Sequence, residues 1–256
     1  MANAQEPLYN PAVFETGRWE EPLGHWEACR IEALVRAIPN GVARIVDVGC
    51  GDGRLTQVLA ERGYDVMGVD PSPTALARLR VPHKRGSAEA LDFPDNSFDV
   101  AICTEVLEHL PDAIMIGALS ELQRVARFYV LITVPYCEDL AQLMVKCPAC
   151  GTVFHAYGHL RSFSQADVEG LMPECDLIDH VNKPSRIYDP RLLWFRQRVL
   201  RRYAYADHCV CPRCCHDDFS AHSGDLLRRL MGGVNLLFTR GRTRPGGWIL
   251  GRFRVG

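Results

Sequence analysis

The fold is decided by ARIVDVGCGDGRLT, which runs from Ala43 to Thr56, and by YDVMGVDPS, which runs from Tyr64 to Ser72. The residues from Arg44 to Val48 are mostly apolar and β-branched, three glycines then interrupt the run, and an amphipathic segment begins at Leu55. This order predicts a strand, a glycine turn, a helix and a second strand. Together they form a nucleotide-binding βαβ half.

The glycine turn and the end of the second strand carry the binding signal. Glycines let the backbone turn sharply and approach a ligand, while a helix N-terminus offers free N–H groups to a carboxylate or phosphate. Asp70 lies roughly twenty residues past the loop, where a carboxylate can accept hydrogen bonds from both ribose hydroxyls. The loop reads D-x-G-x-G-x-G from Asp47, and Arg54 stands where the dinucleotide fingerprint has its third glycine. No pyrophosphate cradle is therefore required.

A second group of motifs follows in GSAEALDFPDNSFDVAICTEVLEHLPD, from Gly86 to Asp112. With these motifs and the glycine loop, the chain resembles the class I S-adenosylmethionine (SAM)-dependent methyltransferases, specifically the small-molecule group that includes ubiquinone-type O-methyltransferases. The resemblance covers about Ala33 to Phe163. It implies an α/β fold with a Rossmann-like, mostly parallel sheet of seven strands, helices on both faces, and SAM as the cofactor.

The resemblance also implies eight cofactor-binding residues. Asp47, Gly49 and Gly51 would line the methionine end, and Asp70 would bind the ribose. Ser87, Ala88 and Glu89 would flank the adenine, and Thr104 would lie beside the sulfonium.

Strand and helix patterns alternate along the chain, which argues for a parallel sheet. The expected strands are Arg44 to Val48, Asp65 to Val69, His83 to Gly86, Phe98 to Cys103, Phe128 to Pro135, Asp176 to Val181 and Gly247 to Val255. The resemblance implies that the last two form an antiparallel pair. A helical pattern from Glu20 to Ile38 is expected to cap the open end of the cofactor pocket.

The chain divides into three parts by pattern and charge. Residues 1–182 form the predicted SAM-binding core with its cap helix, residues 183–246 a basic helical insertion with half of a zinc site, and residues 247–256 the final strand. From Lys183 onward, roughly 15 Lys and Arg stand against roughly 5 Asp and Glu, which leaves the first part near −12. Insertions of this length are usually functional.

Composition places the chain among globular proteins, because 47% of its residues are hydrophobic. The first residues show no basic and apolar export signal, and no window reaches about 18 continuous apolar residues. We therefore expect a cytoplasmic location. In that compartment the 11 cysteines favour thiols or metal ligation over disulfides.

Two C-P-x-C motifs indicate a structural zinc site with Cys147, Cys150, Cys211 and Cys214 as ligands. Each motif places two thiolates on one side of a tetrahedron, and two motifs complete it. Because about sixty residues separate the pairs, the site would pin the insertion to the loop after the fifth strand. The alternative is reduced surface cysteines or a redox pair. Substitute ligands that the sequence leaves open are Cys209, Cys215, His208 and His216. No chemistry is assigned to Cys29, Cys50, Cys103, Cys137 or Cys175.

Transfer of a methyl group to a hydroxyl requires alignment of the two groups and removal of a proton. His109, in the segment EVLEH after the fourth strand, is the candidate general base; the alternative is a histidine that only orders the loop. In the segment GHLRSF, His159 or Arg161 would face the acceptor, and Ser164 is the expected N-cap of a helix from Gln165 to Leu171.

The same segments also resemble the small-RNA 2′-O-methyltransferases, in which two glutamates and two histidines surround a divalent cation. This resemblance implies Glu105, Glu108, His109 and His159 as ligands of a cation such as Mg²⁺, which would polarise the ribose hydroxyls. Small-molecule enzymes with similar segments need no metal. Dependence of activity on Mg²⁺ or Mn²⁺ separates the two.

The insertion has basic, apolar segments at Arg191 to Tyr205 and at Asp225 to Arg244. Their apolar faces are first expected to pack on the domain, with the arginines solvated or paired with the acidic first part. A second interpretation is an anionic acceptor, phosphorylated or nucleotide-linked. A third is contact with a membrane surface or RNA.

The sequence thus predicts a SAM-dependent methyltransferase acting on a hydroxyl oxygen of a small molecule or glycan. The alternatives are the metal-dependent RNA enzyme and a non-catalytic SAM-binding scaffold with a zinc-stapled surface.

Overall fold

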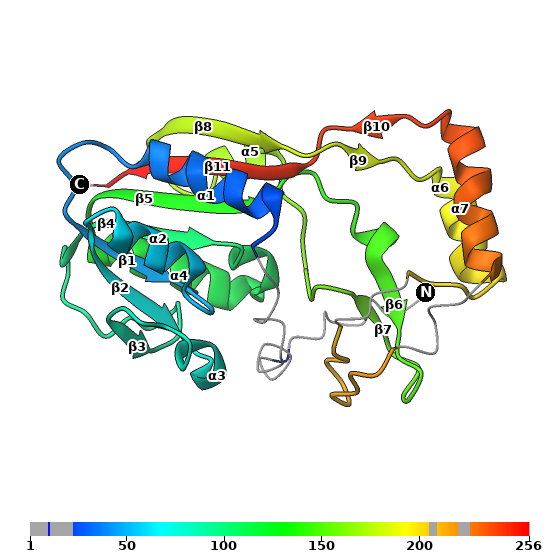
Figure 1. Cartoon of the computed structure of the whole chain (residues 1–256), viewed down its shortest axis with the longest axis horizontal. Helices are drawn as coiled ribbons and strands as arrows, with labels where there is room; N and C mark the ends of the chain where they lie inside the picture. The colour runs from blue at the N-terminus through cyan, green and yellow to red at the C-terminus, as the bar shows by residue number, and fades with distance from the viewer. Residues whose placement is uncertain (1–9, 11–22, 205–208, 220–225, 256) are drawn as a thin grey trace.

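A seven-stranded sheet forms the centre of the structure, a computed structural model that describes Asn10 and residues 23–204, 209–219 and 226–255. The strand order is β3-β2-β1-β4-β5-β11-β8, and β11 runs antiparallel to both of its neighbours (Figure 1). The strands are β1 (Arg44–Val48), β2 (Asp65–Asp70), β3 (His83–Arg85), β4 (Phe98–Thr104), β5 (Ala126–Pro135), β8 (Cys175–Asn182) and β11 (Gly247–Arg254). The predicted α/β fold, with its mostly parallel sheet and antiparallel final pair, is confirmed.

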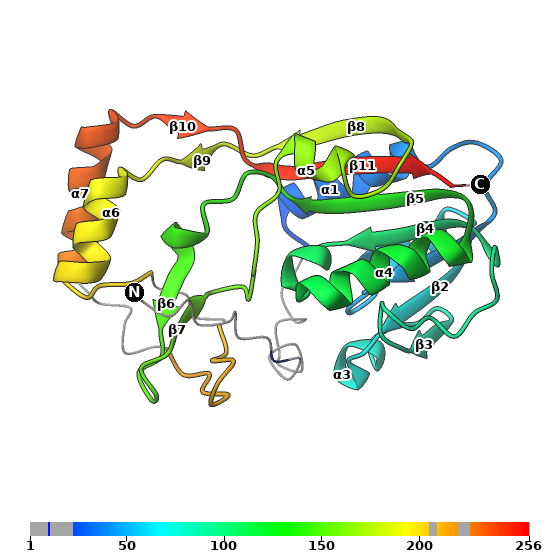
Figure 2. The same cartoon turned by 180° about the vertical axis from the view of Figure 1, so that it is seen from behind.

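Helices cover both faces of this sheet (Figures 1 and 2). One face carries α1 (His25–Ala37) and α2 (Arg54–Glu61), and the other carries α4 (Asp112–Val125) and α5 (Gln165–Glu169). Alternation within the strands explains the two layers. In β1, Ile45 packs with the first pair of helices, whereas Val46 packs with the second. Both side chains are fully buried.

Two expected helices are present with changed bounds. Ser164 caps α5 as predicted, because its hydroxyl accepts from the N–H of Asp167 while the Asp167 carboxylate accepts from the N–H of Ser164. The helix ends at Glu169, before the expected Leu171. The helix expected from Glu20 begins at His25 among the described residues and lies across β5, β11 and β8. Its first turn reaches the loop edge of the sheet, where Glu27 pairs with Arg54 at 3.1 Å.

Two small antiparallel pairs of strands lead away from the sheet. Between β5 and α5, β6 (Met144–Lys146) and β7 (Val153–His155) form an antiparallel pair. Beyond β8, β9 (Ser185–Arg186) pairs with β10 (Thr243–Arg244), which returns the chain to β11. Both views show this ribbon leading to helices at the end of the molecule farthest from β3 (Figures 1 and 2).

The helices at this end are α6 (Pro190–Trp194), which continues as the π-helical turn η5 (Phe195–Val199), and α7 (Leu226–Thr239). Tyr205 and Asp225, which bounded the two expected segments, lie outside the described residues. The expectation that their apolar faces pack on the domain is wrong. Ten large apolar side chains of these helices are exposed, because the two helices are joined to each other through Asn235 and lie away from the sheet (Figures 1 and 2).

Candidate functional site

The glycine loop after β1 has the backbone conformation that the sequence pattern predicts. Gly49, Gly51 and Gly53 have φ angles of 75°, 55° and 80°, in the left-handed region. A Cβ at Gly49 would lie 2.2 Å from Cγ2 of Val106, so no other residue fits there without a shift. The N–H of Gly49 donates to the carbonyl of Val69 at 2.7 Å, which holds the loop against β2.

Asp47, in β1, carries a buried carboxyl beside this loop. Its Oδ2 accepts from the hydroxyl of Thr56 at 2.7 Å, whereas Oδ1 has no hydrogen-bond partner among the described residues. Burial raises the pKa of this carboxyl to about 6, and the nearby charge of Asp70 adds to the rise. The Thr56 hydrogen bond and the charge of Arg30 act in the opposite direction. A buried acceptor without a donor is the condition that a ligand N–H group would relieve.

The raised pKa of Asp47 predicts a pH-dependent stability. The folded protein keeps this proton up to pH about 6, whereas the unfolded chain loses it near 3.8, so Asp47 destabilises the ligand-free fold increasingly as pH rises through this window. At neutral pH the cost is about 3 kcal/mol. We expect Asp47→Asn to unfold at a higher temperature than the parent at pH 8, with the difference shrinking by about half at pH 5. A difference that does not change with pH would contradict this assignment.

Asp70 ends β2, and both of its carboxylate oxygens accept hydrogen bonds from backbone N–H groups. Oδ2 accepts from the N–H of Gly51 at 2.9 Å and Oδ1 from the N–H of Ser72 at 2.8 Å. A carboxylate can accept about four hydrogen bonds in all, and an acidic residue at this point of the fold is the group that accepts from ribose hydroxyls. The sequence placed Asp70 correctly at the end of its strand, and the structure adds that it also fixes the glycine loop.

The residues expected near the adenine follow β3. The hydroxyl of Ser87 donates to the carboxylate of Glu89, and Ala88 packs on the edge of the core under α4. Glu89 is exposed. Thr104 ends β4 opposite Thr133 of β5.

All eight predicted cofactor residues therefore lie at or near the carboxyl ends of β3, β2, β1 and β4. Strand order reverses between β1 and β4, which is where ligands bind in open α/β sheets.

The EVLEH segment after β4 begins with a half-buried glutamate. Glu105 has a φ of 57°, and its carboxylate accepts from Nε1 of Trp248 at 2.6 Å and from the hydroxyl of Thr133 at 3.3 Å. Burial raises its pKa. The buried guanidinium of Arg30 lies beside this group, donating to Thr133 at 3.4 Å and lowering the pKa of Glu105. Glu105 is thus held within the protein and is not one of the residues that converge on the histidines.

Glu108, by contrast, is only 1% exposed, and neither of its carboxylate oxygens has a hydrogen-bond partner among the described residues. Burial, reinforced by the charge of Glu105, raises its pKa well above the usual range. Glu108, His109 and His159 place their ligand-type atoms within 4.8 Å of one another. The rings of His109 and His159 pack edge to face, with their centroids 4.8 Å apart. The two predicted catalytic histidines are therefore adjacent.

Glu138 completes this cluster and was missed by the sequence analysis. Its carboxylate accepts from Nδ1 of His159, and Nε2 of His155 lies 3.8 Å away. The rings of His155 and His159 stack at 4.7 Å, and Nδ1 of His155 accepts from the backbone N–H of His159. Burial lowers the pKa of His155 to about 4, so this imidazole is neutral at physiological pH.

Three further contributors left only weak signals in the sequence. Glu138 follows β5 by three residues, at the same edge of the sheet as Asp70, which is the one usable signal. Arg30 was hidden by the apolar pattern of its helix, and Trp248 by the long insertion before β11.

Arg161 was expected to face the acceptor, but its guanidinium is engaged elsewhere. It donates to the carbonyl of Leu110 and to the sulfur of Met115, and it pairs with Asp112 at 2.8 Å. Arg161 thus ties the segment after β7 to the start of α4. His159 is the member of that pair which faces the cluster.

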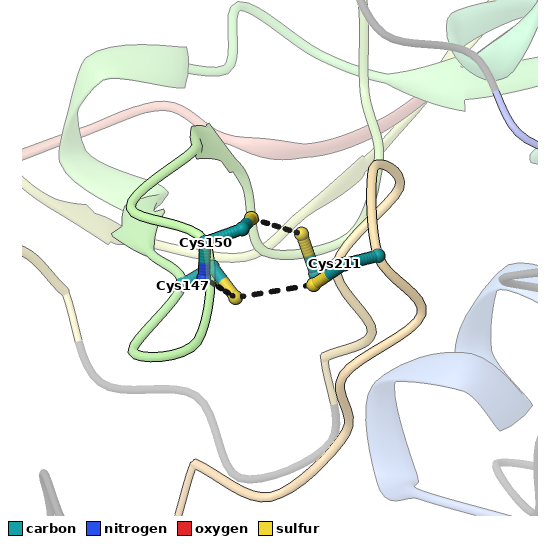
Figure 3. Close-up of side chains that lie close together, drawn as sticks. Cys147, Cys150 and Cys211 are labelled. Carbon is teal, nitrogen blue, oxygen red and sulfur yellow. Dashed lines mark hydrogen bonds between the residues drawn. The ribbon is translucent and has the colours of Figure 1, made fainter.

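A candidate metal centre lies apart from this edge. Sγ of Cys147 is 3.6 Å from Sγ of Cys214, and Sγ of Cys150 is 3.5 Å from Sγ of Cys211 (Figure 3). All four sulfur atoms lie within 4.8 Å of one another, and no disulfide joins them. A tetrahedron with Zn–S bonds of about 2.3 Å has sulfur–sulfur edges of about 3.8 Å. The donor set and its spacing fit zinc.

The two motifs fold as equivalent turns, with the same backbone hydrogen bonds at corresponding residues. In the first turn, the backbone N–H of Cys147 donates to the carbonyl of Thr152, and the carbonyl of Cys147 accepts from the N–H of Gly151. In the second turn, the N–H of Cys211 donates to the carbonyl of His216, and the carbonyl of Cys211 accepts from the N–H of Cys215. Gly151 and Cys215, the equivalent fifth residues, both have positive φ angles, of 73° and 55°.

None of the described substitute ligands belongs to the four-sulfur group. Cys215 is the turn residue, and Nε2 of His216 bonds the carbonyl of Asp218. Cys209 is buried in the small core beneath the turns. His208 lies outside the described residues.

Fold and site together define a class of domain. A sheet of this order, with a glycine loop after β1 and an acidic residue ending β2, has the same fold as solved SAM-dependent methyltransferases. Residues 46–128 match the family described as Methyltransferase domain. The resemblance inferred from the sequence is confirmed.

Curated relatives match over the same region. A ubiquinone biosynthesis O-methyltransferase of Methylococcus capsulatus is 41% identical over 124 residues, which are 42% of this chain and 52% of the relative. A protein of the same name from Azorhizobium caulinodans is 41% identical over 78 residues, 27% of this chain and 31% of the relative. The chain thus spans about a third to a half of the length of these relatives.

Solved structures extend the likeness in fold to most of the chain. A SAM-dependent methyltransferase from Archaeoglobus fulgidus covers 90% of this chain and 95% of its own length, with a TM-score of 0.53 and 17% identity. One from Mesorhizobium loti covers 90% and 98%, with a TM-score of 0.50 and 16% identity. At such identities the likeness shows the fold alone.

Among the described residues, no helix combines the length and the hydropathy that a membrane span requires.

Proposed function

We propose that this protein transfers a methyl group from SAM to a hydroxyl oxygen of a small-molecule acceptor. The observation that carries the proposal is the edge of the sheet at Asp47, the glycine loop and Asp70. The residues there fit the cofactor, because Oδ1 of Asp47 is a buried acceptor without a donor among the described residues, and the positive φ angles of the glycine loop let its backbone approach a ligand. Asp47, Gly49 and Gly51 would hold the methionine end, Asp70 the ribose, and Ser87, Ala88 and Glu89 the adenine.

The histidine cluster would act on the acceptor. SAM supplies an electrophilic methyl group when bound. His109 would accept the acceptor's hydroxyl proton as general base. His159 would orient His109 through the ring contact, and Glu138 would fix the proton of His159 on Nδ1. The O-methyltransferase names of the relatives support an oxygen acceptor; within that class, phenols, sugars and nucleotide-linked sugars are the compounds to test.

Zinc at Cys147, Cys150, Cys211 and Cys214 is part of the proposal as a structural ion. It would hold the β6–β7 hairpin to the segment around Cys211, which lies within the insertion. Beneath the turns, Phe154 and Phe219 pack in a small core of their own. Because β7 ends at His155, the zinc centre would also support the wall that carries the histidine cluster.

One observation favours a second candidate, a divalent-metal-dependent 2′-O-methyltransferase acting on RNA. Glu108, His109 and His159 converge, and the carboxylate of Glu108 lacks a partner among the described residues. Glu105, the fourth ligand expected, lies outside the group with its carboxylate on Trp248. Activity that persists after EDTA treatment and dialysis, with zinc still bound, would exclude this candidate.

The substitution His109→Ala tests the proposed base. Loss of a positioned general base lowers turnover by about 100-fold or more, so we expect kcat to fall by that factor while the Kd for SAM stays within threefold. Turnover is measured as transfer of a labelled methyl group to a panel of phenols, sugars and nucleotide sugars. His83→Ala is the matched control, because His83 is exposed at the amino end of β3. Near-full turnover in His109→Ala would remove this residue from the mechanism, and SAM binding without turnover on any acceptor would favour the scaffold.

A further inference from the structure

The two helices at the end of the insertion, which we call the arm (residues 190–199 and 226–239), present an unusual surface. Ten of the fifteen large apolar side chains that are exposed among the described residues lie on them. The most exposed are Leu237 at 79%, Leu226 at 69%, Phe238 at 65% and Trp194 at 60%. Scattered exposed apolar residues are ordinary, but a concentration of this kind marks an interaction surface.

The arm is a fixed unit, and these side chains point away from its interior. The buried amide of Asn235 donates to the carbonyl of Ile187 at 2.9 Å and accepts from the N–H of Asp189 at 2.8 Å. Leu193 and Met231 are buried in the same structure. The residues that join the two helices are therefore already used, and the exposed apolar residues are additional to them.

Charge on the arm has one sign. Arg191, Arg198 and Arg229 are exposed on the helices, and Arg240 and Arg242 are exposed just beyond α7. Neither residues 190–204 nor residues 226–255 contain a single Asp or Glu. A partner must therefore offer apolar depth and negative charge together.

We propose that the arm binds the surface of an anionic lipid bilayer. Interfacial helices combine Leu, Phe and Trp on one side with Arg or Lys at the polar boundary, which is the composition found here. A second copy of the chain would bring arginines against arginines, which is unfavourable. RNA would bind the arginines but give no burial to aliphatic residues such as Leu226 and Leu237.

Length also favours binding at the surface over insertion through the bilayer. Helix α7 has 14 residues, which span about 21 Å, whereas a bilayer core is about 30 Å thick. Trp194 is an aromatic residue of the kind that prefers the headgroup level. The proposal does not depend on methyl transfer, because the arm shares no residue with the cofactor edge.

The test uses the whole chain of 256 residues, loaded with zinc, and vesicles of phosphatidylcholine with or without phosphatidylglycerol. We expect the parent to float with the anionic vesicles at low salt and to bind neutral vesicles at least tenfold less. The double variant Leu237→Glu/Phe238→Glu should lose at least tenfold of the anionic binding. Ile116→Glu, at a residue of α4 that is 65% exposed, is the matched control and should bind like the parent.

A second readout reports the arm directly. The emission of Trp194 should shift to shorter wavelength on anionic vesicles, and Trp194→Phe should abolish the shift. Far-UV circular dichroism and zinc content check that each variant is folded. The proposal would be overturned if the parent did not float with anionic vesicles, or if the double variant bound them as well as the parent does. It would also be overturned if the parent formed a dimer that the double variant does not form, or if the double variant still bound RNA.

Discussion

Replacing Asp70 with alanine is expected to weaken SAM binding by about 100-fold or more. Hydrogen bonds to a charged group contribute roughly 1.5–3 kcal/mol each, and the two ribose hydroxyls would donate two of them. A loss of about 2.7 kcal/mol corresponds to 100-fold in Kd. The substitution also frees the N–H groups of Gly51 and Ser72, so the glycine loop loses its anchor at the same time. Titration calorimetry with SAM and S-adenosylhomocysteine measures the effect.

The matched control for this variant lies on the same strand. Asp65 begins β2 and pairs with Arg44 at 3.1 Å, where both side chains are well exposed. Surface pairs of this kind contribute little, so Asp65→Ala should leave both SAM binding and folding nearly unchanged. If folded Asp70→Ala protein bound SAM within threefold of the parent, the proposed ribose contact would be wrong.

Removing the metal centre is expected to have the second large effect. Cys211→Ser should reduce zinc from one ion per chain to nearly none, because a structural site needs its closed set of four ligands. Structural zinc contributes about 10 kcal/mol or more of folding free energy. The β6–β7 hairpin and the segment around Cys211 should then exchange their amide hydrogens rapidly, while the seven-stranded sheet stays protected. Metal analysis and hydrogen exchange measure the two consequences.

Cys215→Ser provides the matched control, because Cys215 is exposed and occupies the turn position equivalent to Gly151. This variant should keep its zinc. In Cys211→Ser, methyl transfer should fall more steeply than SAM binding, because His155 ends the hairpin and stacks on His159. Equal zinc content in the two variants, or substoichiometric zinc in the parent, would contradict the assignment.

Much of the fold could be predicted because its signals are local. The apolar run before Gly49 and the positive φ angles that its loop requires are properties of neighbouring residues. The same holds for the cysteine turns, whose spacing within each motif predicted the sulfur geometry. The structure also brings the two turns together across about sixty residues, as we expected because two thiolates alone cannot complete a tetrahedral site.

The remaining features depend on tertiary packing, which leaves no local signal. Glu138 meets His159 only because the segment after β7 returns to the end of β5. The burial of Arg30 depends on where α1 crosses the sheet. The arm shows the same dependence on tertiary packing. Apolar residues at helical spacing predicted its helices, but they did not predict whether a core would cover the apolar residues.

Titration of the zinc-loaded protein with SAM measures whether the edge of the sheet at Asp47, the glycine loop and Asp70 binds the cofactor. We expect one site per chain with micromolar affinity, retained by the His109→Ala variant and weakened by about 100-fold or more in Asp70→Ala. Absence of binding by folded, zinc-loaded protein would contradict this expectation.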